Sequence, residues 1–200
     1  MLNKAFIAGV GMVPFVKPGA NAPYPTMAAQ AVQLALADAG TAYGEVQQAY
    51  AGYVYGDSTA GQKALYGVGM TGIPIVNVNN NCSTGSTALF LGRQAIESGA
   101  VDCVLVLGFE QMNPGAIGNV FTDRPSPFED FDREAAALVG LPELPLALRY
   151  FGGAGQSHMQ KYGTPLEAFA QVRAKASRHA ARNPLALLGK ELTVDDVTHD

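Results

Sequence analysis

Residues 79–88, Asn-Asn-Asn-Cys-Ser-Thr-Gly-Ser-Thr-Ala, are the stretch that decides the fold of this 200-residue chain. Residues 73–78 precede it and are rich in β-branched side chains, which predicts a strand. Residues 87–98 follow with a mostly apolar helical pattern, and Gly99 stands where a glycine commonly ends a helix. Cys82 is therefore predicted on a turn that leads from a buried strand into the N-terminus of a buried helix.

The predicted position of Cys82 suits a nucleophile. A helix N-terminus presents unpaired backbone N–H groups and the positive end of the helix dipole, and both favour an anion such as a thiolate. The same N–H groups can stabilise the oxyanion of a thioester under attack, as in the nucleophile elbow of serine hydrolases. The alternative is a buried structural cysteine, but asparagines before Cys82 and Ser83-Thr84-Gly85 after it make a polar turn.

Composition limits the class of protein. The chain is 48% hydrophobic and 15% charged, which is typical of a globular domain and leaves little room for extended disorder. A net charge of −4 disfavours nucleic-acid binding, which needs a basic surface. No apolar run approaches the length of a membrane span, and the N-terminus lacks the features of a signal peptide. Two cysteines without paired metal spacing predict reduced thiols, no metal site and a cytoplasmic location.

Strand and helix patterns alternate through the first half of the chain. Because alternating strands and helices form parallel βαβ units, the pattern predicts an α/β fold with a mostly parallel sheet flanked by helices. The predicted strands are 5–10, 46–55, 73–78 and 101–107, and the predicted helices are 26–39, 62–69 and 87–98. The side chains predicted to be buried around the last of these helices are Val76, Val78, Leu89, Leu105 and Leu107.

Two further features belong to the strand at 101–107. Cys103 has apolar neighbours and no polar turn, so we interpret it as a packed structural cysteine. Glu110 and Met112 follow the strand at the carboxyl edge of the sheet, where sites of α/β proteins form. Glu110 is either a catalytic carboxylate or a hydrogen-bonded organiser of the site, and a single acid without a partner favours the second role.

The side-chain pattern of the sequence changes at Asn113. An acidic cluster at Glu129, Asp130 and Asp132 is interpreted as a solvated loop, since no rigid metal-ligand spacing is visible. Helical patterns return at 156–163 and 165–182. In the second of these helices, basic side chains recur on one side at three- and four-residue spacing, either as a solvated face or as a patch for the phosphates of a nucleotide cofactor. These side chains are Lys175, Arg178, His179 and Arg182.

Several segments together resemble the thiolases of the sterol-carrier-protein type, also called lipid-transfer-protein thiolases. The turn segment at 77–89 is similar to the active-site segment of that family. Four further matches run in order along the chain, which makes the resemblance far more specific than one cysteine motif. They are Gly-Tyr-Val-Tyr-Gly-Asp-Ser-Thr at 52–59, Gly-Met-Thr-Gly-Ile-Pro at 69–74, Leu-Gly-Phe-Glu-Gln-Met at 107–112 and His-Met-Gln-Lys-Tyr-Gly at 158–163.

The resemblance implies a fold, a domain division and an activity. A complete thiolase stacks two similar halves into α-β-α-β-α layers. Residues 1–112 then correspond to the first core half with the nucleophile, and 113–200 to the start of the loop-domain insertion that covers coenzyme A. Cys82 is implied to be the acylated nucleophile, with its own N–H in an oxyanion hole, and Asn81, Glu110 and Met112 are assigned as organisers of the site.

The implied reaction is transfer of an acyl group from a 3-ketoacyl-CoA through Cys82 to coenzyme A, in lipid or sterol side-chain degradation. Coenzyme A is then a substrate and no cofactor is tightly bound. Lys175, Arg178 and Arg182 are the candidate cofactor-binding residues. The resemblance also implies a homodimer or higher oligomer, and a peroxisomal location if the source is eukaryotic.

The remaining catalytic groups of a thiolase find no match here. The family uses an activating histidine, a second cysteine and a His-Asp-Cys-Phe segment, all in the second half of its fold, so a chain of these 200 residues alone is expected to lack full turnover. The alternatives are a ketosynthase-type condensing enzyme, a thiolase-like aldolase subunit, or an inactive assembly subunit. Cys82 weighs against the aldolase subunit, because relatives of that kind have lost the nucleophilic cysteine.

Overall fold

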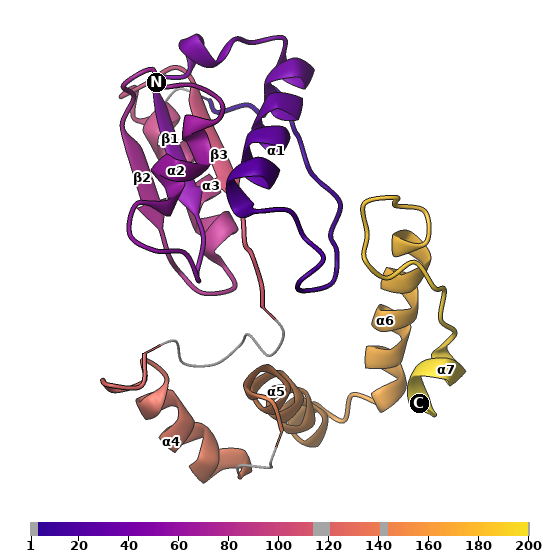
Figure 1. Cartoon of the computed structure of the whole chain (residues 1–200). Coiled ribbons are helices and arrows are strands. Elements are labelled where there is room, and N and C mark those ends of the chain that lie inside the picture. Colours follow the sequence, from indigo (N-terminus) through magenta and orange to yellow (C-terminus); the bar gives the residue numbers. More distant parts are fainter. Residues whose placement is uncertain (1–3, 114–120, 141–143, 200) are drawn as a thin grey trace. The chain divides into compact units, whose positions relative to one another are not determined.

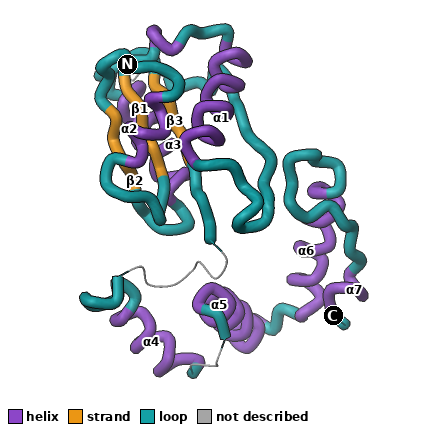
Figure 2. Tube along the Cα trace, viewed as in Figure 1, coloured by secondary structure: helices purple, strands orange, loops and turns teal. Residues whose placement is uncertain are grey.

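The computed structural model describes residues 4–113, 121–140 and 144–199. The chain divides into two compact units, Met1–Asn113 and Pro114–Asp200. The first unit contains every strand of the described part, and the second is helical (Figure 2). Cys82 lies in the first unit, so that unit is described first.

A three-stranded parallel sheet is the centre of the first unit (Figure 1). Its strands are β1 (Gln48–Gly52), β2 (Ile75–Val78) and β3 (Val104–Gly108), in the order β2-β1-β3. The register pairs Gly52 with both Val78 and Gly108, so all three strands end at the same edge. This edge is the carboxyl edge at which sites of α/β proteins commonly form. The predicted parallel α/β architecture is confirmed.

Helices cover both faces of this sheet. One face packs against α1 (Tyr24–Ala39) and α2 (Ala60–Tyr66), and the core there includes Val32, Leu65 and Leu105. The opposite face packs against α3 (Thr84–Glu97) through Tyr50, Val78 and Ala88. Residues 49 and 50 of β1 thus point to opposite faces, as the two-residue period of a strand requires. A short 3₁₀ helix, η1 (Tyr43–Glu45), leads from α1 toward β1.

Helix α3 packs closely on the sheet because its contact residues are small. A Cβ atom at Gly92 would lie 2.8 Å from a methyl group of Val106, which is closer than carbon atoms approach. Ala88 and Ala95 are also buried on this face. The larger side chains of α3 point elsewhere, and Leu89 and Phe90 are about half exposed. The prediction of Leu89 as a core residue is therefore wrong, as is that of Val76, which is 38% exposed. Val78, Leu105 and Leu107 are buried as predicted.

The predicted strand at 5–10 is wrong. Residues 4–17 contain no strand, and Phe6, Ile7 and Val10 are largely exposed. The segment lies along α1, where the Val10 N–H donates to Asp38 Oδ2 at 2.9 Å. A side chain at Gly11 would collide with the backbone of α1, so only glycine permits this approach.

The second unit consists of α4 (Glu129–Val139), α5 (Leu146–Tyr162), α6 (Leu166–Ala180) and α7 (Val194–Thr198). The interpretation of Glu129, Asp130 and Asp132 as a loop is wrong, because these acids form the first turn of α4. Carboxylates there complement the positive end of the helix dipole. The helix predicted at 156–163 begins earlier, at Leu146, and the helix predicted at 165–182 is confirmed as α6 with shorter ends.

Candidate active site

Cys82 lies on the turn between β2 and α3, two residues before the first residue of the helix. Its side chain is exposed and its thiol is free. Asn81, directly before it, has a φ of 47°, in the left-handed region that residues other than glycine seldom adopt. Asparagine is among the residues that tolerate this conformation best, because its short polar side chain can hydrogen-bond locally. The predicted strand-turn-helix position of Cys82 is confirmed, with α3 beginning three residues earlier than predicted.

Hydrogen bonds within the turn hold its backbone. The Asn80 N–H donates to Thr84 Oγ1 at 2.9 Å, and the Asn80 side-chain amide donates to Thr87 Oγ1 at 2.9 Å. The Ser83 hydroxyl donates to the Asn80 carbonyl at 2.8 Å and does not cap α3. The first turn of α3 therefore has no side-chain cap from Ser83 beside Cys82. Such a turn is suited to an anion, because helix N–H groups and the dipole act there together.

The turn is fixed to the carboxyl edge of the sheet through Thr84. Thr84 is buried, and a Cβ atom at Gly52, the last residue of β1, would lie 2.7 Å from its methyl group. The Tyr53 N–H continues the ladder by donating to the Val78 carbonyl at 3.2 Å. The chain that follows β1 therefore lies beside the chain that follows β2. This arrangement brings residues 53–55 to the same edge as Cys82.

Glu110 connects the ends of β1 and β3. Its Oε2 accepts the N–H groups of Val54 at 2.9 Å and Tyr55 at 3.3 Å, and its Oε1 accepts the Gln111 N–H at 3.2 Å. The carboxylate is half-buried. These contacts are those of an organiser that holds backbone, the role favoured from the sequence. Met112 is half-buried two residues further along, and its part in the site stays a prediction.

Tyr55 is a residue of this edge that the sequence analysis did not assign to the site. Its side chain is half-buried, and burial raises the pKa of its hydroxyl. The negative charges of Glu110 and of the Cys82 thiolate raise that pKa further. Tyr55 follows β1 just as Glu110 follows β3 and Cys82 follows β2. That shared position after parallel strands was the signal available in the sequence.

The other cysteine has a different environment. Cys103 immediately precedes β3, is half-buried and packs against the core on the face of α1 and α2. Burial raises the pKa of its thiol, and the nearby carboxylate of Glu45 raises it further. A raised pKa lowers the fraction of reactive thiolate at neutral pH. Cys103 is therefore a packed cysteine, as the sequence indicated.

The basic side chains predicted to bind a cofactor lie in the second unit. Lys175 and Arg178 are exposed on α6, and Arg182 is exposed in the turn that follows the helix. Ala170, Ala174 and Ser177 form the buried side of the same helix. The cations therefore lie on the outer face, near the C-terminus, where positive charge complements the helix dipole. Their role toward a phosphate stays a prediction.

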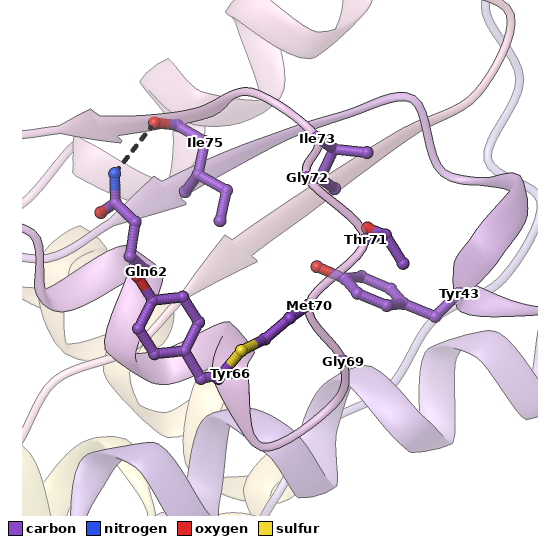
Figure 3. Close-up of a pocket in the computed structure, with 9 residues that line it drawn as sticks. All are labelled: Tyr43, Gln62, Tyr66, Gly69, Met70, Thr71, Gly72, Ile73 and Ile75. Atoms are coloured by element: carbon purple, nitrogen blue, oxygen red, sulfur yellow. Dashed lines mark hydrogen bonds between the residues drawn. The ribbon is translucent and has the colours of Figure 1, made fainter.

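The structure also has a pocket of about 360 Å³ at the other edge of the sheet (Figure 3). Tyr43, Tyr66 and Met70 line it, together with the segment that leads into Ile75 at the start of β2. The Gln62 side chain donates to the Ile75 carbonyl at 3.4 Å. Because β2 runs from this pocket toward the turn at Cys82, the pocket and the thiol lie at opposite ends of the strand. The pocket is therefore not part of the candidate site.

A metal-binding cluster and a membrane-spanning helix are both absent from the part of the chain that the structure describes. Within residues 4–113, 121–140 and 144–199, no three histidine, cysteine or acidic side chains gather as they would around a metal ion. None of the helices in that part of the chain combines the length and apolar character needed to cross a bilayer.

The structure is a parallel α/β sheet with an exposed cysteine on a strand-turn-helix at its carboxyl edge. The chain belongs to the thiolase family, since the family model described as "Thiolase, N-terminal domain" matches residues 5–186. The resemblance found in the sequence is thereby confirmed.

The similar proteins include a particular branch of that family. The chain is 51% identical to "Sterol carrier protein 2" of Oryctolagus cuniculus and 49% identical to that of Homo sapiens, in each case over 98% of its length. It is 30% identical over 98% of its length to "Benzoylsuccinyl-CoA thiolase subunit BbsB" of Thauera aromatica, of which it covers 49%. The chain spans about a third, 36%, of the sterol carrier proteins it matches.

Solved structures confirm the fold. The structure titled "Ltp2-ChsH2(DUF35) aldolase" matches all of this chain and 49% of its own with a TM-score of 0.73 at 21% identity. The Acat5 thiolase from Ascaris suum, solved in complex with coenzyme A, matches 88% of this chain and 48% of its own with a TM-score of 0.60 at 18% identity. The predicted thiolase-like fold is therefore correct.

Proposed function

We propose that this chain carries the nucleophile of a thiolase-type acyltransferase, with Cys82 as the residue that is acylated. The observation that carries the proposal is the exposed free thiol of Cys82 on a hydrogen-bonded turn at the N-terminus of α3. Membership of the thiolase family supports it. The names of the sterol carrier relatives point to a sterol or another lipid as the substrate, and we infer that its acyl group is presented as a fatty or sterol side-chain acyl-CoA ester.

In the proposed reaction, the Cys82 thiolate attacks the keto carbon of a 3-ketoacyl-CoA. The carbon–carbon bond next to that carbon breaks, and acetyl-CoA leaves as an enolate that takes up a proton. The acyl group stays on the Cys82 sulfur as a thioester, and the thiol of free coenzyme A then attacks it and releases acyl-CoA. N–H groups at the turn, including that of Cys82, stabilise the oxyanion that forms in each attack.

Two measurements test Cys82 as the nucleophile. Limited alkylation with iodoacetamide and peptide mass mapping should label Cys82 well before Cys103, because Cys103 is half-buried and its pKa is raised. Incubation with acetoacetyl-CoA in the presence of the second half of the thiolase fold, followed by acid quenching, should place an acetyl group on the Cys82 peptide, and added coenzyme A should remove it. Cys82→Ser is the control and should abolish the acetyl label. Acetyl groups spread over both cysteines, or absent from Cys82, would refute the proposal.

We propose further that Lys175, Arg178 and Arg182 bind the phosphates of coenzyme A. Their support is the exposed row of positive charge that they form on the outer side of α6. Replacing all three with alanine should weaken coenzyme A binding by about tenfold or more in calorimetric titration at low salt. Arg173→Ala is the matched control, since Arg173 is an exposed arginine of the same helix outside this row. Equal effects of both variants would contradict the assignment.

The assembly and the compartment remain proposals of the same kind. We propose a homodimer or higher oligomer, which sedimentation equilibrium of the purified protein would detect. We also propose a cytoplasmic location, or a peroxisomal one in a eukaryote, which imaging of the tagged protein in its own cell would test. A monomer at micromolar concentration, or a tagged protein in another compartment, would contradict these two statements.

A further inference from the structure

The ends of the three strands gather one aromatic hydroxyl with the candidate nucleophile and an acid. Tyr55 follows β1, Cys82 follows β2 and Glu110 follows β3, and the register ends all three strands at one edge. The order β2-β1-β3 places the chain after β1 between the other two. Tyr55 therefore lies on the segment that the topology sets between the ends of β2 and β3.

Hydrogen bonds fix the backbone of Tyr55 at this edge. Its N–H donates to Glu110 Oε2 at 3.3 Å, and the N–H of Val54 donates to the same oxygen at 2.9 Å. Two residues earlier, the Tyr53 N–H donates to the Val78 carbonyl at 3.2 Å. The backbone of this segment is thus attached to both neighbouring strand ends.

We propose that Tyr55 is a further residue of the Cys82 site, whose hydroxyl donates a hydrogen bond to the Cys82 sulfur when the thiolate forms. The inference rests on the proposed function, in which Cys82 is the nucleophile. A thiolate accepts hydrogen bonds and cannot donate them, so a neutral hydroxyl beside it stabilises the anion. Tyr55 keeps its proton at neutral pH, because burial and the charges of Glu110 and Cys82 all raise its pKa.

Few other charged groups face this edge from the elements packed around it. Glu110 contributes a negative charge from the end of β3, and Asp57 lies on the exposed loop that follows Tyr55. Helix α3 carries Arg93 and Glu97, which pair with each other at 2.8 Å in its last turns, far along the helix from Cys82. Helix α2 carries Lys63.

The test is the rate of Cys82 alkylation as a function of pH in the full chain and in Tyr55→Phe. Loss of the donor should slow alkylation by iodoacetamide at neutral pH by about three- to tenfold, the change expected for a hydrogen bond of ordinary net strength at a partly exposed site. At strongly alkaline pH, where the thiol is fully ionised in both proteins, the two rates should converge. A general loosening of the turn would change the rate at every pH.

The matched control is Tyr53→Phe. Tyr53 lies at the same strand end, is 8% exposed, and its hydroxyl donates to the Asp57 carbonyl at 3.0 Å rather than toward Cys82. This variant should leave the pH profile of Cys82 unchanged, and the alkylation of Cys103 should be the same in all three proteins. Circular dichroism melting curves establish that both variants fold.

Each outcome supports or contradicts the role proposed for Tyr55 or for Cys82. A neutral-pH loss in Tyr55→Phe that disappears at high pH, with Tyr53→Phe unchanged, supports the proposal. An unchanged profile in Tyr55→Phe, or equal changes in both variants, overturns it while Cys82 can still be the nucleophile. If Cys82 of the unaltered protein reacts no faster than Cys103, the proposed function itself fails, and that result is visible before any variant is compared.

Discussion

Removal of the Glu110 carboxylate should destabilise the first unit. The carboxylate accepts three backbone N–H groups, at 2.9, 3.3 and 3.2 Å, and joins the ends of β1 and β3. A hydrogen bond to a charged group contributes about 1.5–3 kcal/mol, and a buried N–H left without an acceptor costs about 1–3 kcal/mol. Because Glu110 is half-buried, water can replace part of what is lost. We therefore expect Glu110→Ala to lower the free energy of unfolding by about 2–3 kcal/mol.

The amide variant separates charge from hydrogen bonding. Glu110→Gln keeps one oxygen that can accept the N–H groups of Val54 and Tyr55, and it loses the charge. The loss should be about 1–2 kcal/mol, the difference between charged and neutral acceptors. Urea unfolding followed by circular dichroism measures both values, and hydrogen exchange of the peptide that contains Val54 and Tyr55 should quicken in the order unaltered protein, Gln variant, Ala variant.

The control for Glu110 is an acidic residue whose carboxylate accepts no N–H group of the described backbone. Glu45 is exposed in η1, so Glu45→Ala changes the net charge equally and should stay within about 0.5 kcal/mol of the unaltered protein. If Glu110→Ala is no less stable than Glu45→Ala, the carboxylate does not hold the strand ends. In that case the role assigned to Glu110 is wrong.

Three further outcomes are expected. Tyr150 donates to Asp132 at 2.5 Å, and burial together with this partner raises its pKa to about 12. Stability that is complete below about pH 10 should therefore fall as the pH rises toward 12. Ultraviolet titration of tyrosinate should show the late titration, and Asp132→Asn should move it only part of the way back, because burial is the larger cause. Leu65→Ala, at a fully buried position, should cost about 2–5 kcal/mol in urea unfolding, whereas Leu89→Ala, at a half-exposed position, should cost clearly less, and equal losses would contradict the packing. Ser177→Ala should destabilise the second unit by about 1–3 kcal/mol, because the buried hydroxyl accepts the Leu192 N–H at 2.9 Å, and an unchanged melting curve would contradict this.

Local patterns account for what could be predicted from the sequence. The strand at 75–78, the polar turn and the helix after Cys82 follow from side-chain period and turn chemistry within about twenty residues, and all three were predicted. The helix at 24–39 ends at Gly40, whose φ is 63°, for the same local reason. Periodicity also predicted the parallel sheet, because alternating elements leave few topologies open.

Errors arose where burial depends on distant elements. Residues 5–10 form an apolar run typical of a buried strand, but the run does not reveal that this segment lies along α1 instead of in the sheet. Leu89 has the character of a core residue, yet α3 faces the sheet with Gly92 and its small neighbours instead. The acids at 129–132 were assigned to a loop because their charge dominates the pattern, although charge in a first turn also favours a helix.

In the candidate site, too, residues within one turn could be predicted, whereas a contact made through strand pairing could not. Cys82 and Asn81 could be predicted because a single turn contains them. Tyr55 was not assigned, since it meets Glu110 only through the pairing of β1 with β3, more than fifty residues apart, and its position after a predicted strand was the one signal for it.

The first unit contains Cys82, Tyr55 and Glu110 together, and each is held by hydrogen bonds or strand pairing inside that unit. The reactivity of the thiol should therefore change in variants of these residues. Coenzyme A binding should weaken in variants of the basic row if that row contacts its phosphates. Alkylation rates and binding affinities measured on both sets of variants test the nucleophile and the binding surface separately.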